Sequence, residues 1–102
     1  YNGLERYEDA ANALKRAAAI EPGNASAHFN LGLTLFNARR YSEAIEAYKQ
    51  VIKLRPTLAQ AHFNLALTYF AINDKKQAMD EYEILKPLNA QLAQQLYSVL
   101  NP

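Results

Sequence analysis

One segment of this 102-residue chain occurs twice at a fixed distance. Residues 25–36 read ASAHFNLGLTLF, and residues 59–70, an offset of 34, read AQAHFNLALTYF. The offset persists more faintly downstream, where Ala44, Tyr48 and Leu54 return as Ala78, Tyr82 and Leu88. A period of this length is typical of stacked repeat proteins, in which each unit contacts only its neighbours. It argues against most enzyme folds before any single residue is considered.

The residues within each unit predict helices. Alanine is abundant, there are only three glycines, and runs of β-branched residues are absent, all of which favours helix. Apolar residues recur three or four apart from Ala27 to Ala38 and again from Tyr41 to Leu54. The short break at 37–40 predicts antiparallel neighbours. The next unit repeats this pattern at 59 to about 72 and 75 to about 86, with a turn at 73–74.

Capping residues and prolines predict where these helices begin and end. Asn24 is a good N-cap for the helix from residue 25. Pro56 ends the preceding helix because proline lacks the backbone donor. Thr57 is then expected to cap the next helix, with Gln60 as its capping-box partner. Pro87 falls in the last turn of the helix that follows and is expected to kink or shorten it.

Extending the period towards the N-terminus predicts a truncated first unit. Residues 1–5 would be the last turn of a first helix, and residues 7–20 would be the second helix. A unit that lacks most of its first helix leaves an apolar face of the second helix without a partner, and burial of such a face is worth about 25 cal/mol per Å². The residues on this face are Ala10, Ala13, Leu14 and Ala17. We therefore expect either further repeats before Tyr1 or pairing of this face with another molecule.

The C-terminal segment 91–100 predicts an extra helix with two different faces. A stack of repeats needs such a helix, polar on its outer side, to cover the last apolar surface. The expected inner residues are Leu92, Leu96, Val99 and Leu100, and the expected outer residues are Gln91, Gln94, Gln95 and Ser98.

Charge and composition exclude several functional classes. The net charge of +1 gives no strong electrostatic case for nucleic acid or an anionic membrane as partner. No apolar run approaches the roughly 18–20 residues of a membrane span. The chain has no cysteine, which removes disulfides, thiol catalysis and cysteine zinc sites.

No catalytic triad, phosphate loop or paired carboxylates are visible, so we expect no catalysis, cofactor or metal. The compartment stays open, with the cytoplasm slightly favoured over the periplasm.

Two sets of repeated polar residues have a structural and a functional interpretation. His28 and His62 are one period apart, but a metal site would need both rings to converge with further ligands. We expect each ring to fill a packing position between helices. Basic residues at the turns (Arg39, Arg40, Lys75 and Lys76) lie near acidic residues of the second helices. A solvated, salt-bridged rim is expected there rather than a site for anions or nucleic acid.

The pattern resembles the tetratricopeptide repeat, a helix-turn-helix unit of 34 residues. Leu31-Gly32, Ala44, Tyr48 and Pro56 stand at its characteristic positions, and Tyr69, Ala78 and Tyr82 match in the next unit. The resemblance implies an all-α fold, a right-handed α-solenoid of stacked antiparallel helix pairs. It divides the chain into a truncated repeat (1–24), two repeats (25–58 and 59–89) and a capping helix (90–102), about two and a third repeats plus the cap.

In this family the first helices of successive units line a concave surface that binds peptides or helices of partner proteins. The matching positions are Ser26, Phe29, Asn30, Leu33, Phe36, Asn37, Gln60, Phe63, Asn64, Leu67 and Phe70. Asn30 and Asn64 are equivalent and resemble an asparagine ladder that grips peptide backbone; solvated surface repeated by duplication is the alternative.

The resemblance also predicts the chemistry of the partner. Family members that bind acidic C-terminal tails carry a clamp of Lys, Arg and Asn, and only Asn30 fits that clamp here. We therefore expect a non-catalytic scaffold for an apolar or mixed segment. Alternatives are a self-assembly module that forms homo-oligomers through the truncated repeat, or an accessory domain of a larger multidomain protein.

Overall fold

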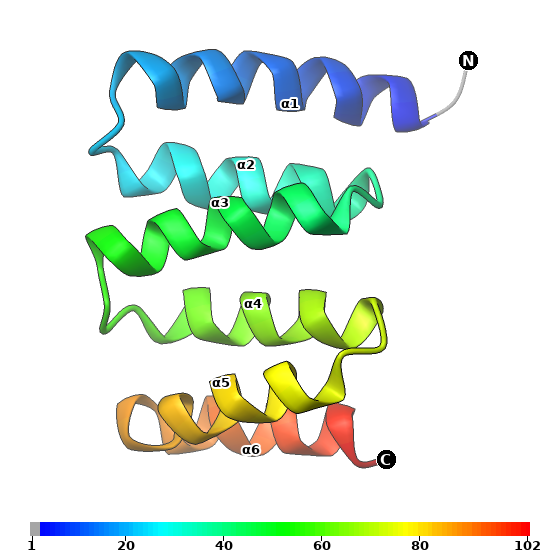
Figure 1. The fold of residues 1–102 in the computed structure, drawn as a ribbon, viewed down its shortest axis with the longest axis vertical. Coiled ribbons are helices and arrows are strands. Elements are labelled where there is room, and N and C mark those ends of the chain that lie inside the picture. Colours follow the sequence, from blue (N-terminus) through cyan, green and yellow to red (C-terminus); the bar gives the residue numbers. More distant parts are fainter. Residues whose placement is uncertain (1–2) are drawn as a thin grey trace.

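The computed structural model describes residues 3–102, with the backbone alone for residues 3–5. Within this range six helices follow one another in a single stack (Figure 1). They are α1 (Gly3–Ile20), α2 (Ala25–Asn37), α3 (Tyr41–Leu54), α4 (Ala59–Ala71), α5 (Lys75–Leu88) and α6 (Ala90–Leu100). Each helix packs against the next along the chain, and α6 also packs against α4. The predicted all-α solenoid of antiparallel helix pairs is confirmed.

The core is continuous from the first helix to the last. One buried cluster extends from Ala11 on α1 to Leu100 on α6, and its largest fully buried side chains include Tyr48, Leu35 and Leu85. No helix could bury its apolar side alone, so the stack is held together by contacts between neighbours. Within residues 3–102, no helix combines the length and the hydropathy that a membrane span requires.

Helices α2 and α3 approach each other closely where Gly32 meets Tyr48. Gly32 is buried on α2, directly against the ring of Tyr48, which is 1% exposed. A Cβ added at Gly32 would lie 2.6 Å from Cε1 of that ring, well inside van der Waals contact. The absent side chain therefore sets the spacing of this pair, and Ala44 on α3 is small and fully buried as predicted.

Of the two predicted N-caps, one is confirmed and the other is wrong. Asn24 caps α2 as expected, since its side chain accepts from the backbone N–H of Ala27. The Thr57 prediction is wrong, because Leu58 stands at the N-cap of α4 and offers no side-chain acceptor. Leu58 is the residue one period after Asn24, so the repeat register decides the boundary and outweighs the preference of threonine for this position.

Pro87 does not shorten α5, so that one of its two alternative predicted effects is wrong. The helix continues to Leu88, with Pro87 inside its last turn. The backbone N–H of Asn89 still reaches the carbonyl of Leu85 at 2.8 Å. A proline this close to the C-terminal end removes one helical hydrogen bond, and the following residues restore the pattern.

At the N-terminal end, the predicted boundary near residue 5 is wrong. Helix α1 is continuous from Gly3, and Tyr1 lies outside the described residues. No proline or capping residue interrupts 4–7, which are mostly good helix formers. The unpartnered face is present as expected: Ala10, Ala13 and Ala17 are exposed and Leu14 is half-buried. One period later, the corresponding residues are at most 5% exposed: Ala44, Ala47, Tyr48 and Val51.

Helix α6 covers the other end of the stack. Its four predicted outer residues, Gln91, Gln94, Gln95 and Ser98, are exposed. Leu96 and Leu100 are buried and Leu92 is partly buried, as expected. Val99 is the exception at 42% exposed, because Ala93, Leu96 and Leu100 complete the inward stripe at helical spacing.

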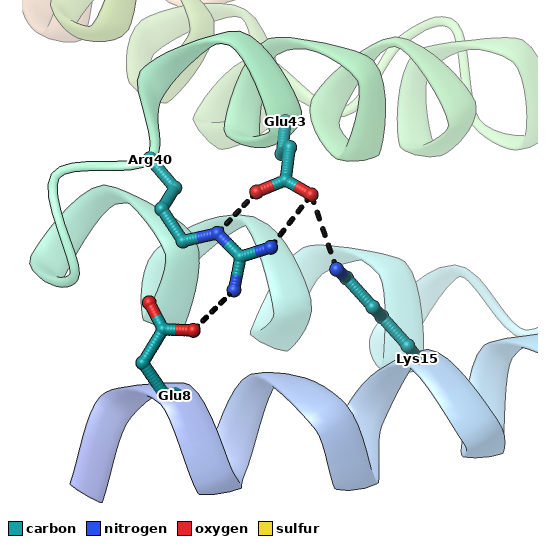
Figure 2. Close-up of polar contacts among 4 residues, drawn as sticks. All are labelled: Glu8, Lys15, Arg40 and Glu43. Atoms are coloured by element: carbon teal, nitrogen blue, oxygen red, sulfur yellow. Dashed lines mark hydrogen bonds and ion pairs between the residues drawn. The ribbon is translucent and has the colours of Figure 1, made fainter. Parts of the chain in front are cut away.

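An ion-pair chain joins α1 to the start of α3 (Figure 2). Arg40 donates to both carboxylate oxygens of Glu43 and to Glu8 at 2.6 Å, and Lys15 donates to Glu43 at 3.1 Å. The Arg40 guanidinium, together with Lys15, holds the pKa of Glu43 below its usual range. The predicted salt-bridged rim is thus confirmed at Arg40. Its members are a quarter to nearly half exposed, so the chain contributes little stability.

Candidate functional site

The predicted partner-binding residues belong to α2 and α4, which run in the same direction (Figure 1). Two hollows are lined by residues of both helices, and we name the seam along which they lie the α2/α4 groove. The first has a volume of about 440 Å³ and is lined by Ala25, Ser26, Phe29, Asn30, Arg55, Leu58 and Gln60. The second has a volume of about 230 Å³ and is lined by Leu33, Phe36, Asn37, Tyr48, Asn64 and Leu67.

The structure brings together most of the predicted residues. Four of the eleven line the first hollow and five line the second. Phe63 lines neither and packs half-buried on the core, while Phe70 is 37% exposed outside both. Sequence reasoning missed four lining residues: Ala25, Tyr48, Arg55 and Leu58. Arg55 and Leu58 belong to the loop before α4, and their position against α2 depends on how the repeats stack.

The aromatic residues of the groove also serve the core. The ring of Phe29 packs edge-on against Tyr48, with centroids 6.0 Å apart, and Phe36 packs in the same way on Tyr41 at 5.3 Å. Such edge contacts stabilise the helix pair beyond their buried area. Phe29 therefore contributes to the core as well as to the groove. Leu33, which is 39% exposed, is the apolar side chain most open to a partner.

The two equivalent asparagines differ in their surroundings. Asn30 is exposed, whereas Asn64 is half-buried and accepts from Nε2 of Gln60 at 3.1 Å. Burial raises the pKa of the Tyr48 hydroxyl to about 12, and its hydrogen bond with the Asn64 side chain partly offsets that rise. One period earlier the residue at the Tyr48 position is Leu14, which has no polar side-chain atom. Asn64 is thus engaged in the fold, and Asn30 is the asparagine available to a partner.

Each of the two repeated histidines contacts a backbone carbonyl of the loop that precedes its helix. Nε2 of His28 lies 3.0 Å from the carbonyl oxygen of Pro22, and Nε2 of His62 lies 2.9 Å from that of Pro56. His62 is buried, as expected of a packing residue, while His28 is only half-buried. In residues 3–102 no three His, Cys, Asp or Glu side chains lie close enough to hold a metal ion.

The helix pairs, their 34-residue period and the close crossing at Gly32 define the architecture, and comparison with known families gives it a name. A family model described as tetratricopeptide repeat matches residues 3–59 and 34–93. The chain belongs to the tetratricopeptide repeat family. Proteins of this family are generally non-catalytic scaffolds for protein–protein interaction. No curated protein sequence matches the chain.

Solved structures with the same fold include two MamA proteins and YrrB. MamA AMB-1 superposes with a TM-score of 0.79 at 28% identity, over 84% of this chain and 51% of that one. MamA MSR-1 gives 0.79 at 27% identity, over 86% and 51%. YrrB, described as a TPR protein with an unusual peptide-binding site, gives 0.84 at 24% identity, over 93% and 50%. The chain therefore spans about half the length of each.

Proposed function

We propose that this domain is a non-catalytic scaffold that binds an extended segment of a partner protein in the α2/α4 groove. The observation that carries the proposal is the alignment of two hollows along one seam, with nine predicted residues lining them. The 13 residues of α2 span about 20 Å at 1.5 Å per residue, which matches about six residues of extended peptide.

The lining predicts the chemistry of the bound segment. Apolar surface comes from Phe29 and Leu33, and amide groups at the edges can pair with peptide backbone. Among the described residues, Arg55 is the single charged side chain that lines either hollow. We therefore propose an apolar or mixed segment with at most one acidic residue near Arg55, rather than an acidic tail.

The test uses peptides selected on the wild-type domain from a displayed library of random sequences. The variant Asn30→Ala combined with Leu33→Asp changes two exposed residues of the groove. We expect the selected peptides to bind this variant at least about tenfold more weakly, since a lost amide contact and a buried charge each cost about 1 kcal/mol or more. Affinity is measured by fluorescence anisotropy.

The control for this test is Lys49→Ala, an exposed change on α3 outside both hollows. It should leave peptide affinity and helicity unchanged. Equal affinity of the Asn30/Leu33 variant and the wild type would refute binding in the groove. Asn64 is left intact because its change would disturb Tyr48 and confuse binding with folding.

A second candidate function is self-association through α1. The exposed residues Ala10, Ala13 and Ala17 form a face whose counterparts on α3 are buried. We expect Ala13→Glu to shift light-scattering mass towards monomer, because a charge on this face is costly to bury. The matched control is Ala19→Glu, since Ala19 is also exposed but lies on the opposite side of the helix at 100° per residue. A monomeric wild type at all concentrations would eliminate this candidate.

A further inference from the structure

A pocket of about 480 Å³ lies on the other side of α2 from the α2/α4 groove. Its walls come from three helices: Lys15 of α1; His28, Leu31 and Leu35 of α2; and Ser42, Glu43, Glu46, Ala47 and Gln50 of α3. At 100° per residue, His28, Leu31 and Leu35 face away from Phe29, Asn30 and Leu33. The pocket is thus separate from the proposed peptide site.

The next repeat shows what occupies the equivalent space. One period after Ala47 stands Glu81, and one period after His28 stands His62. The carboxylate of Glu81 lies 2.7 Å from Nδ1 of His62, and the two side chains are only 14% and 4% exposed. In the repeat 25–58 the small Ala47 leaves this volume open, and His28 borders it.

The ring of His28 has one nitrogen engaged and one available. Since a carbonyl oxygen only accepts, the contact with Pro22 makes Nε2 of His28 the donor. Among the side chains of residues 6–102, none is hydrogen-bonded to Nδ1 of His28. In the repeat 59–89 both nitrogens of His62 face oxygen acceptors, and Glu81 supplies the acceptor at Nδ1.

We propose that the pocket at His28 is a second binding site, which takes the carboxylate of a Glu or Asp side chain of a partner protein. The carboxylate occupies the place of the Glu81 carboxylate, against Nδ1 of His28 and over the apolar floor of Leu31 and Leu35. The bound carboxylate makes a charge-assisted hydrogen bond when the ring carries a proton on both nitrogens.

The charges around the pocket are compatible with this ligand. Glu43 is already paired with Arg40 and Lys15 (Figure 2). Glu46 is exposed. Its counterpart in the repeat 59–89 is Asp80, which precedes Glu81 and does not prevent the contact of Glu81 with His62. Lys15 faces His28 from α1, whereas Glu43 and Glu46 face it from α3.

Acetate is the probe, because it is the part of a glutamate side chain that Ala47 lacks beyond Cβ. The chain has two histidines, so NMR can follow both imidazole rings. We expect acetate to shift the His28 signals saturably, with a Kd on the order of 10–100 mM for so small a ligand. The His62 signals should respond at least about tenfold more weakly, since Glu81 already fills that place. Methylammonium chloride at equal ionic strength controls for salt.

Two reciprocal variants test whether the acetate response requires the open volume beside the histidine. Ala47→Glu should abolish the acetate response of His28, and Glu81→Ala should create one at His62. Ala13→Glu, the same change one period earlier on an exposed site, should leave the His28 response intact. Equal responses of both rings in the wild type, a stronger shift with methylammonium, or an acetate response that persists in Ala47→Glu would overturn the proposal. The comparison of the His28 and His62 responses in the wild type tests the proposal even if a variant fails to fold.

Discussion

Replacing Gly32 with alanine is expected to destabilise the domain, although alanine is the better helix former. Alanine gains about 1 kcal/mol over glycine from helix propensity. The new Cβ, however, would meet three carbons of the Tyr48 ring at 2.6–2.9 Å. That ring is 1% exposed and packs against Phe29, so any shift that relieved the overlap would disturb this packing. Overpacking of this kind costs about 1–3 kcal/mol. Subtracting the propensity gain leaves a net loss of up to about 2 kcal/mol, measured by urea unfolding.

Two comparisons isolate the contact with Tyr48. Gly23→Ala is the matched control, because a Cβ there meets nothing within 4 Å; it should be neutral or slightly stabilising. Tyr48→Leu should weaken the effect of Gly32→Ala, since the clash requires the ring. A Gly32→Ala variant as stable as the wild type would show that α2 and α3 can separate without cost.

The repeat period predicted the fold because each unit must bury its apolar stripe against the next. The helix pairs, the cap at Asn24 and the small residue at Gly32 all follow from local pattern and register. The errors came where local preference and register disagreed. Thr57 has the right chemistry for an N-cap but stands one residue before the position that the repeat assigns, which Leu58 occupies.

The candidate site was predicted less completely, because its residues depend on contacts between repeats. Asn30 and Asn64 look equivalent in sequence, yet only Asn64 meets a tyrosine hydroxyl from the preceding unit. The contact of Glu81 with His62 lies within one repeat but joins two different helices, through residues 19 apart in the sequence. Such contacts become visible only when the helices are placed side by side. The difference between Asn30 and Asn64 could nevertheless have been found in the sequence. One period before Tyr48 stands Leu14, which has no hydroxyl to offer Asn30.

The other large effect is expected at the C-terminal end, where Leu96→Ala should cost about 2–5 kcal/mol, the range for a fully buried leucine. Leu96 is 0% exposed on α6, which packs against both α4 and α5. Its loss leaves a cavity at the surface that seals the stack. Val99→Ala, on the same helix but 42% exposed, is the control and should change stability by no more than about 0.5 kcal/mol.

The location of the lost stability tests the repeat architecture itself. In a stack held by nearest-neighbour contacts, a defect in the last helix first releases the unit beside it. Hydrogen exchange of Leu96→Ala should therefore accelerate most in α5 and α6, less in α4, and least in α2 and α3. Uniform acceleration across all helices would instead indicate a single cooperative unit. In that case α6 would stabilise the α2/α4 groove as strongly as the helices that line it, because the whole stack would open together.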